Sequence, residues 1–224
     1  LTKTFDQAVI SYLKSNPNST YIFLSSGAVY GKDQYYGRKL KSSNLPCPQF
    51  TQRQNSSYAK AKVFAESLHR KNDTLSIIDL RIFGYFSQFI DLSGDFFMAN
   101  VVNSIIYKKE LLTNPNKMVR DYIIPHDLWN LIQACIEYGK FNRALDVFSQ
   151  SPIDKIVLLE EIKRRYELHY SIQKMNKLNE DEDQIDIYFS LDKTAQSIGY
   201  KPDHSSREGI FRELSKLMQS HKIG

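Results

Sequence analysis

A tyrosine and a lysine four residues apart, Tyr58 and Lys62, lie in the segment "NSSYAKAKVFAESLHRK". In a helix this spacing stacks the two side chains on one face, with Cβ atoms about 5–6 Å apart. Asn55 or Ser56 is a natural N-cap, which places Tyr58 in the first turn near the positive end of the helix dipole. An ammonium one turn away favours the ionised form of a nearby acid. The pair is therefore predicted to carry a proton.

Two other tyrosines also precede a lysine by four residues, in the pairs Tyr35–Lys39 and Tyr170–Lys174. Tyr170 and Lys174 lie in "YSIQK", whose alternation is typical of a strand, where this spacing separates residues by roughly 13 Å. Tyr35 and Lys39 bracket Gly37 in a loop of no fixed geometry. An isolated match on a helix is more often an exposed lysine beside a half-buried tyrosine, so the surrounding elements decide what the motif means.

Apolar strands alternate with amphipathic helices along the chain. The opening helix, residues 3–15, is predicted to place Phe5, Val9, Tyr12 and Leu13 on one side. The predicted strands are "TYIFLSS", "LSIIDLRIFG", "RDYII", "RALDVFS" and "YSIQKM", and further helices are expected near residues 57–71, 95–108, 125–139, 152–168, 192–198 and 206–219. This alternation predicts an α/β fold with a parallel sheet covered by helices on both faces.

In such a sheet, ligands bind at the carboxyl ends of the strands. "TYIFLSS" ends in Ser25 and Ser26, so these two serines are expected at a functional site. The Ser26 hydroxyl would bind the same substrate oxygen as Tyr58 and steady the charge that develops there.

Bulk properties limit the classes of protein. The chain has 224 residues, a net charge of +5 and a pI of about 9.0, but acidic residues interleave with the basic ones, so no nucleic-acid partner is expected. No apolar run approaches the roughly 20 residues of a membrane span. Cys47 and Cys135 have no short-range partner, which predicts a reducing compartment and a cytoplasmic protein without a metal site.

"FLSSGAVYG" followed by "SSYAKAK" resembles the extended short-chain dehydrogenase/reductase family, which includes the nucleotide-sugar epimerases and dehydratases. The family pattern is a strand that ends in Ser-Ser or Ser-Thr, then "VYG", then a Tyr-x-x-x-Lys helix. Four later segments resemble family segments in the same order: "LRIFGYF", "VRDYIIPHDL", "LDVFSQSPIDKIVLLEEI" and "LDKTAQSIGYKPDHSSREGI". The resemblance runs from about Phe5 to Leu217 and implies a Rossmann-type fold with NAD or NADP as cofactor.

The resemblance also implies roles for individual residues. Ser26 matches the catalytic serine or threonine, Tyr58 the catalytic acid or base, and Lys62 the lysine that holds the nicotinamide ribose. Ser25 and Phe83 are assigned to the cofactor site, Phe83 because it falls where the family's chain passes the nicotinamide.

The implied substrate is a nucleotide-diphosphate sugar. Arg120 matches an arginine that grips the diphosphate through its forked head, the alternative being a surface arginine beside Asp121. Gly84 stands where many members carry a substrate-binding asparagine, and Phe97 lies near a second such position. With Ser26, these residues make up the predicted substrate site.

The chain departs from the family pattern in three further places. No G-x-x-G-x-x-G fingerprint follows a strand, so the chain is expected to be the C-terminal part of a longer protein, or to have its first half supplied separately. Gly27 and Ala28 stand where the 4,6-dehydratases have Asp-Glu, so dehydration is not expected. The acidic "NEDEDQ" at residues 179–184 occupies the neighbourhood of a second diphosphate-binding arginine.

Residues 1–90 are expected to form the C-terminal part of a dinucleotide-binding Rossmann domain, with a returning strand near 143–149. Residues 91–224 are expected to form mainly a small α/β substrate-binding subdomain. The predicted function is an NAD(P)-dependent nucleotide-sugar epimerase or 4-ketoreductase, in which Tyr58 moves the hydroxyl proton as hydride leaves or enters a sugar carbon. The alternative is a non-catalytic Rossmann-like module that senses dinucleotide or binds a protein. The resemblance also implies a homodimer, formed through the Tyr58 helix and the opening helix.

Overall fold

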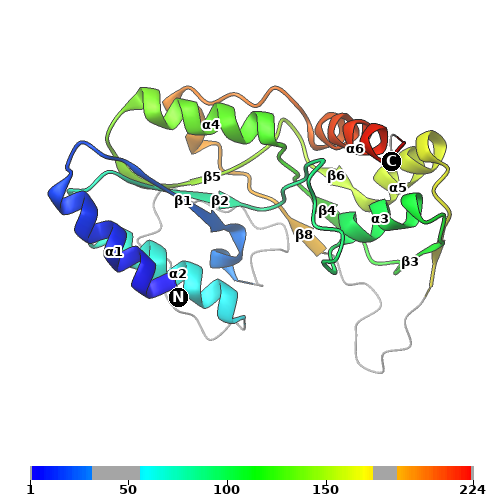
Figure 1. Ribbon diagram of the computed structural model, residues 1–224, viewed down its shortest axis with the longest axis horizontal. Coiled ribbons are helices and arrows are strands. Elements are labelled where there is room, and N and C mark those ends of the chain that lie inside the picture. Colours follow the sequence, from blue (N-terminus) through cyan, green and yellow to red (C-terminus); the bar gives the residue numbers. More distant parts are fainter. Residues whose placement is uncertain (1, 32–55, 174–185, 223–224) are drawn as a thin grey trace.

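The computed structural model describes residues 2–31, 56–173 and 186–222 (Figure 1). Its elements form two groups. The first is centred on a parallel sheet of three strands, β1 (Tyr21–Ser26), β2 (Ile77–Ile82) and β5 (Asn142–Asp146), in the order β1-β2-β5. The register pairs Ser26 with Ile82 and Leu80 with Leu145, so the carboxyl ends of the strands lie at one edge.

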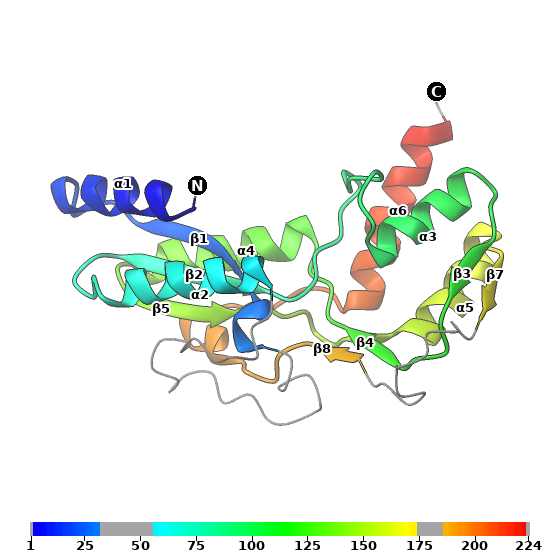
Figure 2. The ribbon, with the colours of Figure 1, turned by 90° about the horizontal axis from the view of Figure 1, so that it is seen from below.

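Helices cover both faces of this sheet. The helices α1 (Thr2–Ser15) and α2 (Ser57–Arg70) lie on one face, and α4 (Pro125–Tyr138) lies on the other (Figures 1 and 2). Pro125 occupies the first turn of α4, where its missing N–H costs nothing. The prediction of an α/β fold with a helix-flanked parallel sheet is confirmed.

The second group packs short strands among helices. Its elements are α3 (Phe97–Ile106), β3 (Leu111–Thr113), β4 (Met118–Arg120), β6 (Ile153–Asp154), α5 (Lys155–Tyr166), β7 (Tyr170–Ile172), β8 (Asp186–Tyr188) and α6 (Ser206–Lys222). β3 pairs with β7, and β4 lies between β6 and β8. Its core joins α3, α5 and α6 through residues such as Val101, Leu159 and Leu214, all fully buried.

A separate core lies between the parallel sheet and α4. Leu80 and Leu145 of the sheet contact Leu131 and Cys135 of α4, and Tyr200 closes the cluster beyond the 3-10 helix η3 (Thr194–Ile198). Burial raises the pKa of the Cys135 thiol to about 12, so this cysteine is an inert core residue. Cys47 lies outside the described residues.

The buried face of α1 differs from the predicted one. Phe5 and Tyr12 are 61% and 59% exposed, whereas Asp6, Ile10 and Leu13 are buried. The Asp6 carboxylate accepts a hydrogen bond from the Tyr21 hydroxyl of β1 at 3.2 Å. This polar contact turns α1 by about one residue relative to the hydrophobic pattern, which a count of apolar positions does not reveal.

The strand predicted at "RDYII" is also misplaced, because β4 ends at Arg120. The next residue, Asp121, is buried, and its carboxylate accepts hydrogen bonds from the Ser149 N–H and the Ser206 hydroxyl. An inward carboxylate ends the pairing, and Ile123 then forms only an isolated parallel bridge with Tyr85.

A buried polar network crosses the sheet beneath its carboxyl edge. Arg81 of β2 donates to both carboxylate oxygens of Glu66 on α2, the closest contact being 2.6 Å. Its other arm donates to the Tyr30 hydroxyl at 2.7 Å, and Tyr30 in turn donates to Asp146 of β5 at 2.8 Å. Glu66 also accepts from the Ser25 hydroxyl at 2.6 Å. The network therefore ties α2 to all three strands.

Within the described part of the chain, no helix combines the length and the apolar composition that a bilayer crossing requires.

Replacing Arg81 with methionine is expected to lower the free energy of unfolding by about 3–5 kcal/mol, because it leaves the Glu66 carboxylate buried without its partner. Urea denaturation of the complete protein measures the change. Arg143→Met is the matched control, since Arg143 lies exposed on the adjacent strand β5. The control should change stability by no more than about 0.5 kcal/mol. Equal losses in the two variants would show that the network does not stabilise the fold.

Candidate active site

The end of β1 presents the Ser26 side chain at the start of the short 3-10 helix η1 (Gly27–Tyr30). The Ser26 Oγ caps this helix by accepting a hydrogen bond from the Ala28 N–H at 3.2 Å. A hydroxyl that accepts from the backbone keeps its own proton available to donate. Ser26 is 7% exposed and lies 3.4 Å, Oγ to hydroxyl oxygen, from Tyr188 of β8.

The helix α2 begins as the sequence predicts. The Ser56 Oγ accepts from the Ala59 N–H at 3.0 Å, so Tyr58 lies in the first turn. Tyr58 is 56% exposed, and the Lys62 Nζ lies 5.5 Å from the centroid of its ring. The ammonium therefore faces the tyrosine across one helical turn.

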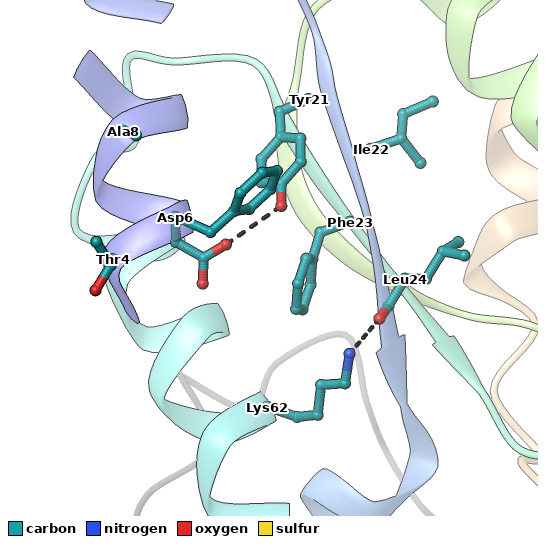
Figure 3. A pocket seen from close by; sticks show the side chains of 9 residues that line it. Thr4, Asp6, Ala8, Tyr21, Ile22, Phe23, Leu24 and Lys62 are labelled. Carbon is teal, nitrogen blue, oxygen red and sulfur yellow. Dashed lines mark hydrogen bonds between the residues drawn. The ribbon is translucent and has the colours of Figure 1, made fainter. Parts of the chain in front are cut away.

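The Lys62 ammonium reaches across to β1 (Figure 3). Its Nζ donates to the Leu24 carbonyl at 2.6 Å and lies 4.4 Å from the centroid of the Phe23 ring. Burial lowers the pKa of Lys62, and the nearby carboxylates of Asp6, Asp79 and Glu66 oppose this effect. The Lys62 side chain thus lies in partly apolar surroundings. Its partner on β1, Leu24, precedes Ser26 by two residues.

Lys62 also lines a hollow of about 730 Å³ between α1 and β1 (Figure 3). Its remaining walls come from Thr4, Phe5, Asp6, Ala8, Tyr21, Ile22, Phe23 and Leu24. Apart from Lys62 and Asp6, this surface is largely apolar, so it suits a ligand or chain segment with an apolar body rather than a fully charged one.

The structure brings the predicted catalytic residues together only in part. Tyr58 and Lys62 share a helix face, and Lys62 touches the strand that carries Ser26. No hydrogen bond joins Tyr58 to Ser26 within residues 2–31, 56–173 and 186–222. Ser25, which was assigned to the cofactor, turns its hydroxyl inward to Glu66, so only its backbone is left for a ligand.

A second cavity, of about 670 Å³, lies beside Ser26 and contains most of the predicted substrate residues. It is lined by Phe83, Gly84, Tyr85, Ser87, Phe89, Ile90, Asp91, Asp95, Phe96, Phe97, Met98, Met118, Arg120, Tyr122 and Tyr188. Phe89 and Phe96 are 83% and 69% exposed, so aromatic side chains stand open at its mouth. We call this cavity the aromatic cleft.

Gly84 has a structural reason to be glycine. A Cβ at this position would lie 2.6 Å from the backbone oxygen of Asp121, closer than such atoms approach. The Gly84 carbonyl accepts from the Ile123 N–H at 2.9 Å, which holds the two segments together. An asparagine, expected here in many relatives, does not fit without a shift of the backbone.

Arg120 is engaged by β8. Its guanidinium donates to the Asp186 carboxylate, and also to the Asp186 carbonyl at 2.9 Å. The side chain of Arg120 is 19% exposed, and its neighbour Asp121 points into the core instead of pairing with it. The ion-pair partner of Arg120 is therefore Asp186 and not the adjacent Asp121.

Sequence reasoning missed Tyr188 and Asp186. Tyr188 packs on Phe83 with ring centroids 5.1 Å apart and lies opposite Arg120 in the β4–β8 pairing. A three-residue strand gives no periodic signal. The only indication in the sequence is the alternation of Asp186 and Tyr188, which places both side chains on one face of a strand.

Among the described residues, His126, Asp127 and His204 have the types and proximity of metal ligands, with ligand atoms within 4.8 Å of one another. His204 lies between Asp127, at 3.1 Å from Nδ1, and Arg212, at 3.0 Å from Nε2. Because the guanidinium only donates, it fixes Nε2 as the acceptor and gives the Nδ1 proton to Asp127. Asp127, His204 and Arg212 thus form a hydrogen-bonded chain, whereas the His126 Nε2 lies 2.8 Å from the Asp203 carboxylate.

Residues 4–148 match the model of the NAD dependent epimerase/dehydratase family, so the chain belongs to this family. None of the curated proteins matches the chain. The predicted membership of the NAD-dependent epimerase/dehydratase family is confirmed.

Several solved structures share its fold at low sequence identity. UDP-glucuronic acid 4-epimerase from Bacillus cereus, in complex with UDP-glucuronic acid and NAD, is 16% identical with a TM-score of 0.68, over 90% of this chain and 62% of that one. UDP-N-acetylglucosamine 4-epimerase from Methanobrevibacter ruminantium is 20% identical with a TM-score of 0.73, over 96% and 67%. RMD from Pseudomonas aeruginosa, complexed with NADPH, is 17% identical with a TM-score of 0.72, over 95% and 71%. The chain thus spans about two-thirds of these structures.

Replacing Gly84 with alanine is expected to destabilise the protein by about 1–3 kcal/mol, because the new methyl group meets the Asp121 backbone. Thermal unfolding measures the change. Gly94→Ala is the control, since a Cβ there would meet mainly the ring of Phe96, 69% exposed and able to move. The control should shift stability by about 0.5 kcal/mol or less. A Gly84→Ala protein as stable as its control would contradict the close approach.

Proposed function

We propose that this chain supplies the catalytic residues and the substrate cleft of an NAD(P)-dependent nucleotide-sugar epimerase or 4-ketoreductase. One observation carries the proposal: Tyr58 and Lys62 share the first turns of a helix beside the end of a parallel strand, in a chain that matches the family over residues 4–148. Two proteins of similar fold were solved with UDP-glucuronic acid and NAD, and another with NADPH.

The residues present fit the nicotinamide end of such a cofactor. An ammonium has three N–H donors, and the Leu24 carbonyl takes one from Lys62. The other two suit a pair of neighbouring ribose hydroxyls, and Phe83, whose buried ring lies next to Gly27 and Tyr188, offers an apolar wall. Bound NAD(P) supplies the hydride acceptor or donor. The pyrophosphate loop is not part of this sequence.

The proton is the task of the chain's own residues. The Tyr58 phenol takes the proton from, or returns it to, the substrate hydroxyl whose carbon is oxidised or reduced. The Lys62 ammonium lies 5.5 Å from the centroid of the Tyr58 ring, and its positive charge stabilises negative charge that develops on the phenol during the transfer. Ser26 donates its hydroxyl proton to the same substrate oxygen, since the Ala28 N–H already occupies a lone pair of its Oγ.

In the aromatic cleft, Arg120 is proposed to bind the diphosphate, with Gly84 and Phe97 in its lining. Residues 91–224 would then hold the sugar nucleotide, apart from the segments that return to the sheet, such as β5.

We also propose a cytoplasmic homodimer formed through α1 and α2. The exposed Phe5 and Tyr12 on α1 support this, because exposed aromatics suit a protein interface.

A non-catalytic dinucleotide sensor or protein-binding module is the second candidate. It is favoured by the two contacts that β8 makes, Tyr188 with Ser26 and Asp186 with Arg120, since both engage residues assigned to the substrate. Turnover of a nucleotide sugar separates the two candidates.

Tyr58→Phe keeps the ring but removes the proton carrier, and should lower kcat/KM by about 10²–10⁴-fold. The assay uses the complete protein with a panel of nucleotide sugars and NAD(H) or NADP(H). Tyr107→Phe is the control, because its ring is 63% exposed, similar to the 56% of Tyr58. The control should retain activity. Equal turnover by wild type and Tyr58→Phe would remove the mechanism, and no turnover with any sugar would favour the non-catalytic module.

A further inference from the structure

The strand β8 carries two polar side chains that contact residues assigned to the substrate. Asp186 accepts a hydrogen bond from Arg120, and Tyr188, which lines the aromatic cleft, lies 3.4 Å from Ser26. It runs parallel to β4, with Asp186 opposite Met118 and Tyr188 opposite Arg120. Residues two apart in a strand point to the same face. A carboxylate and a phenol therefore stand side by side on the surface that faces the proposed substrate residues.

The Asp186 carboxylate pairs with Arg120, the cation that lines the cleft. Arg120 has five N–H donors, and three of them go to the Val119 carbonyl, the Asp186 carbonyl and the Asp186 carboxylate. A phosphate oxygen would seek the same guanidinium edge, because Arg binds carboxylates and phosphates with the same forked geometry. The Asp186 side chain is 50% exposed, so it can rotate into solvent and release Arg120.

The Tyr188 phenol lies at the Ser26 end of the proposed substrate site. The Tyr188 hydroxyl lies 3.4 Å from the Ser26 Oγ, where a substrate oxygen would receive the serine proton. The Tyr188 ring is held between Phe83, with centroids 5.1 Å apart, and the Arg120 guanidinium, 5.6 Å from the ring centroid. Two residues later, the Ser190 hydroxyl donates to buried Asp146, which anchors the end of this segment to the sheet.

We propose that β8 is an internal competitor for the substrate, in which Asp186 stands in for a phosphate group on Arg120 and Tyr188 stands in for the sugar oxygen on Ser26. The inference rests on the proposed function, because it takes Arg120 and Ser26 as the residues that bind a nucleotide sugar. Both contacts come from one three-residue strand. Arg120 contacts both Asp186 and the Tyr188 ring. A diphosphate that draws Arg120 away from Asp186 therefore also weakens the contact of Arg120 with the Tyr188 ring.

The competition predicts tighter binding when a contact is removed, whereas a purely structural contact predicts weaker binding or instability. Asp186→Asn keeps the size of the side chain and removes its charge. Calorimetry with inorganic pyrophosphate on the complete protein should show about two- to fivefold tighter binding, as expected for loss of an exposed ion pair. Arg120→Gln in the Asp186→Asn background should abolish this gain.

Asp95→Asn is the matched control, because it removes the same charge from the lining of the aromatic cleft and Asp95 accepts its hydrogen bond from Asn100 rather than from Arg120. It should not tighten pyrophosphate binding. Equal affinity of wild type and Asp186→Asn, or an equal gain in Asp95→Asn, would overturn the proposal.

Tyr188→Phe tests the second contact, since it keeps the ring on Phe83 and deletes the hydroxyl. It should lower KM for the nucleotide sugar by about twofold, the scale of one weak hydrogen bond, without lowering kcat. A higher KM would overturn the role of Tyr188. If Asp186→Asn binds pyrophosphate more tightly but no nucleotide sugar is turned over, the contact on Arg120 stands and the proposed function fails.

Discussion

The arrangement of the candidate active site depends on one buried ion pair, between Arg81 of β2 and Glu66 of α2. Glu66 lies one helical turn after Lys62. Its carboxylate also accepts a hydrogen bond from the hydroxyl of Ser25, the neighbour of Ser26. The pair therefore sets the position of the Tyr58 helix relative to the strand that ends in Ser26. A buried pair of this kind is costly to break, because either charge alone would remain without solvent or a partner.

The same network explains a residue of the "VYG" motif that the chemistry does not use. The Tyr30 hydroxyl accepts from Arg81 and donates to Asp146, and the Tyr30 ring stacks on Phe83 with an interplanar angle of 21°. Burial raises the pKa of Asp146 to about 6, while the nearby Arg81 opposes that rise. Tyr30 thus links Arg81 of β2 to Asp146 of β5 through hydrogen bonds. Its ring also supports Phe83 in the wall of the aromatic cleft, so Tyr30 has a structural role beside the site.

Two surfaces lie near the candidate catalytic residues. The hollow between α1 and β1 contains Lys62 and has mainly apolar walls. The aromatic cleft contains Arg120 and has open aromatic rings. Ser26 lies between these surfaces along the chain, at the end of β1 and in contact with Tyr188. In the proposed enzyme, the aromatic cleft would take the sugar nucleotide, and the proton would move at Ser26 and Tyr58.

Local sequence is enough to predict the Ser56 cap of α2, the proline start of α4, the apolar strands and the helical spacing of Tyr58 and Lys62. Each of these follows from residues within one or two turns of each other, so short-range propensity decides them. Long-range contacts instead fix the buried face of α1, the end of β4, the glycine at position 84 and the pairing of Arg120 with Asp186. These features depend on partners 15 to 85 residues away in the chain, such as Tyr21 for Asp6 and Ser206 for Asp121. Contacts at such distances leave no periodic pattern, because packing and the burial of charge select them after the elements have formed.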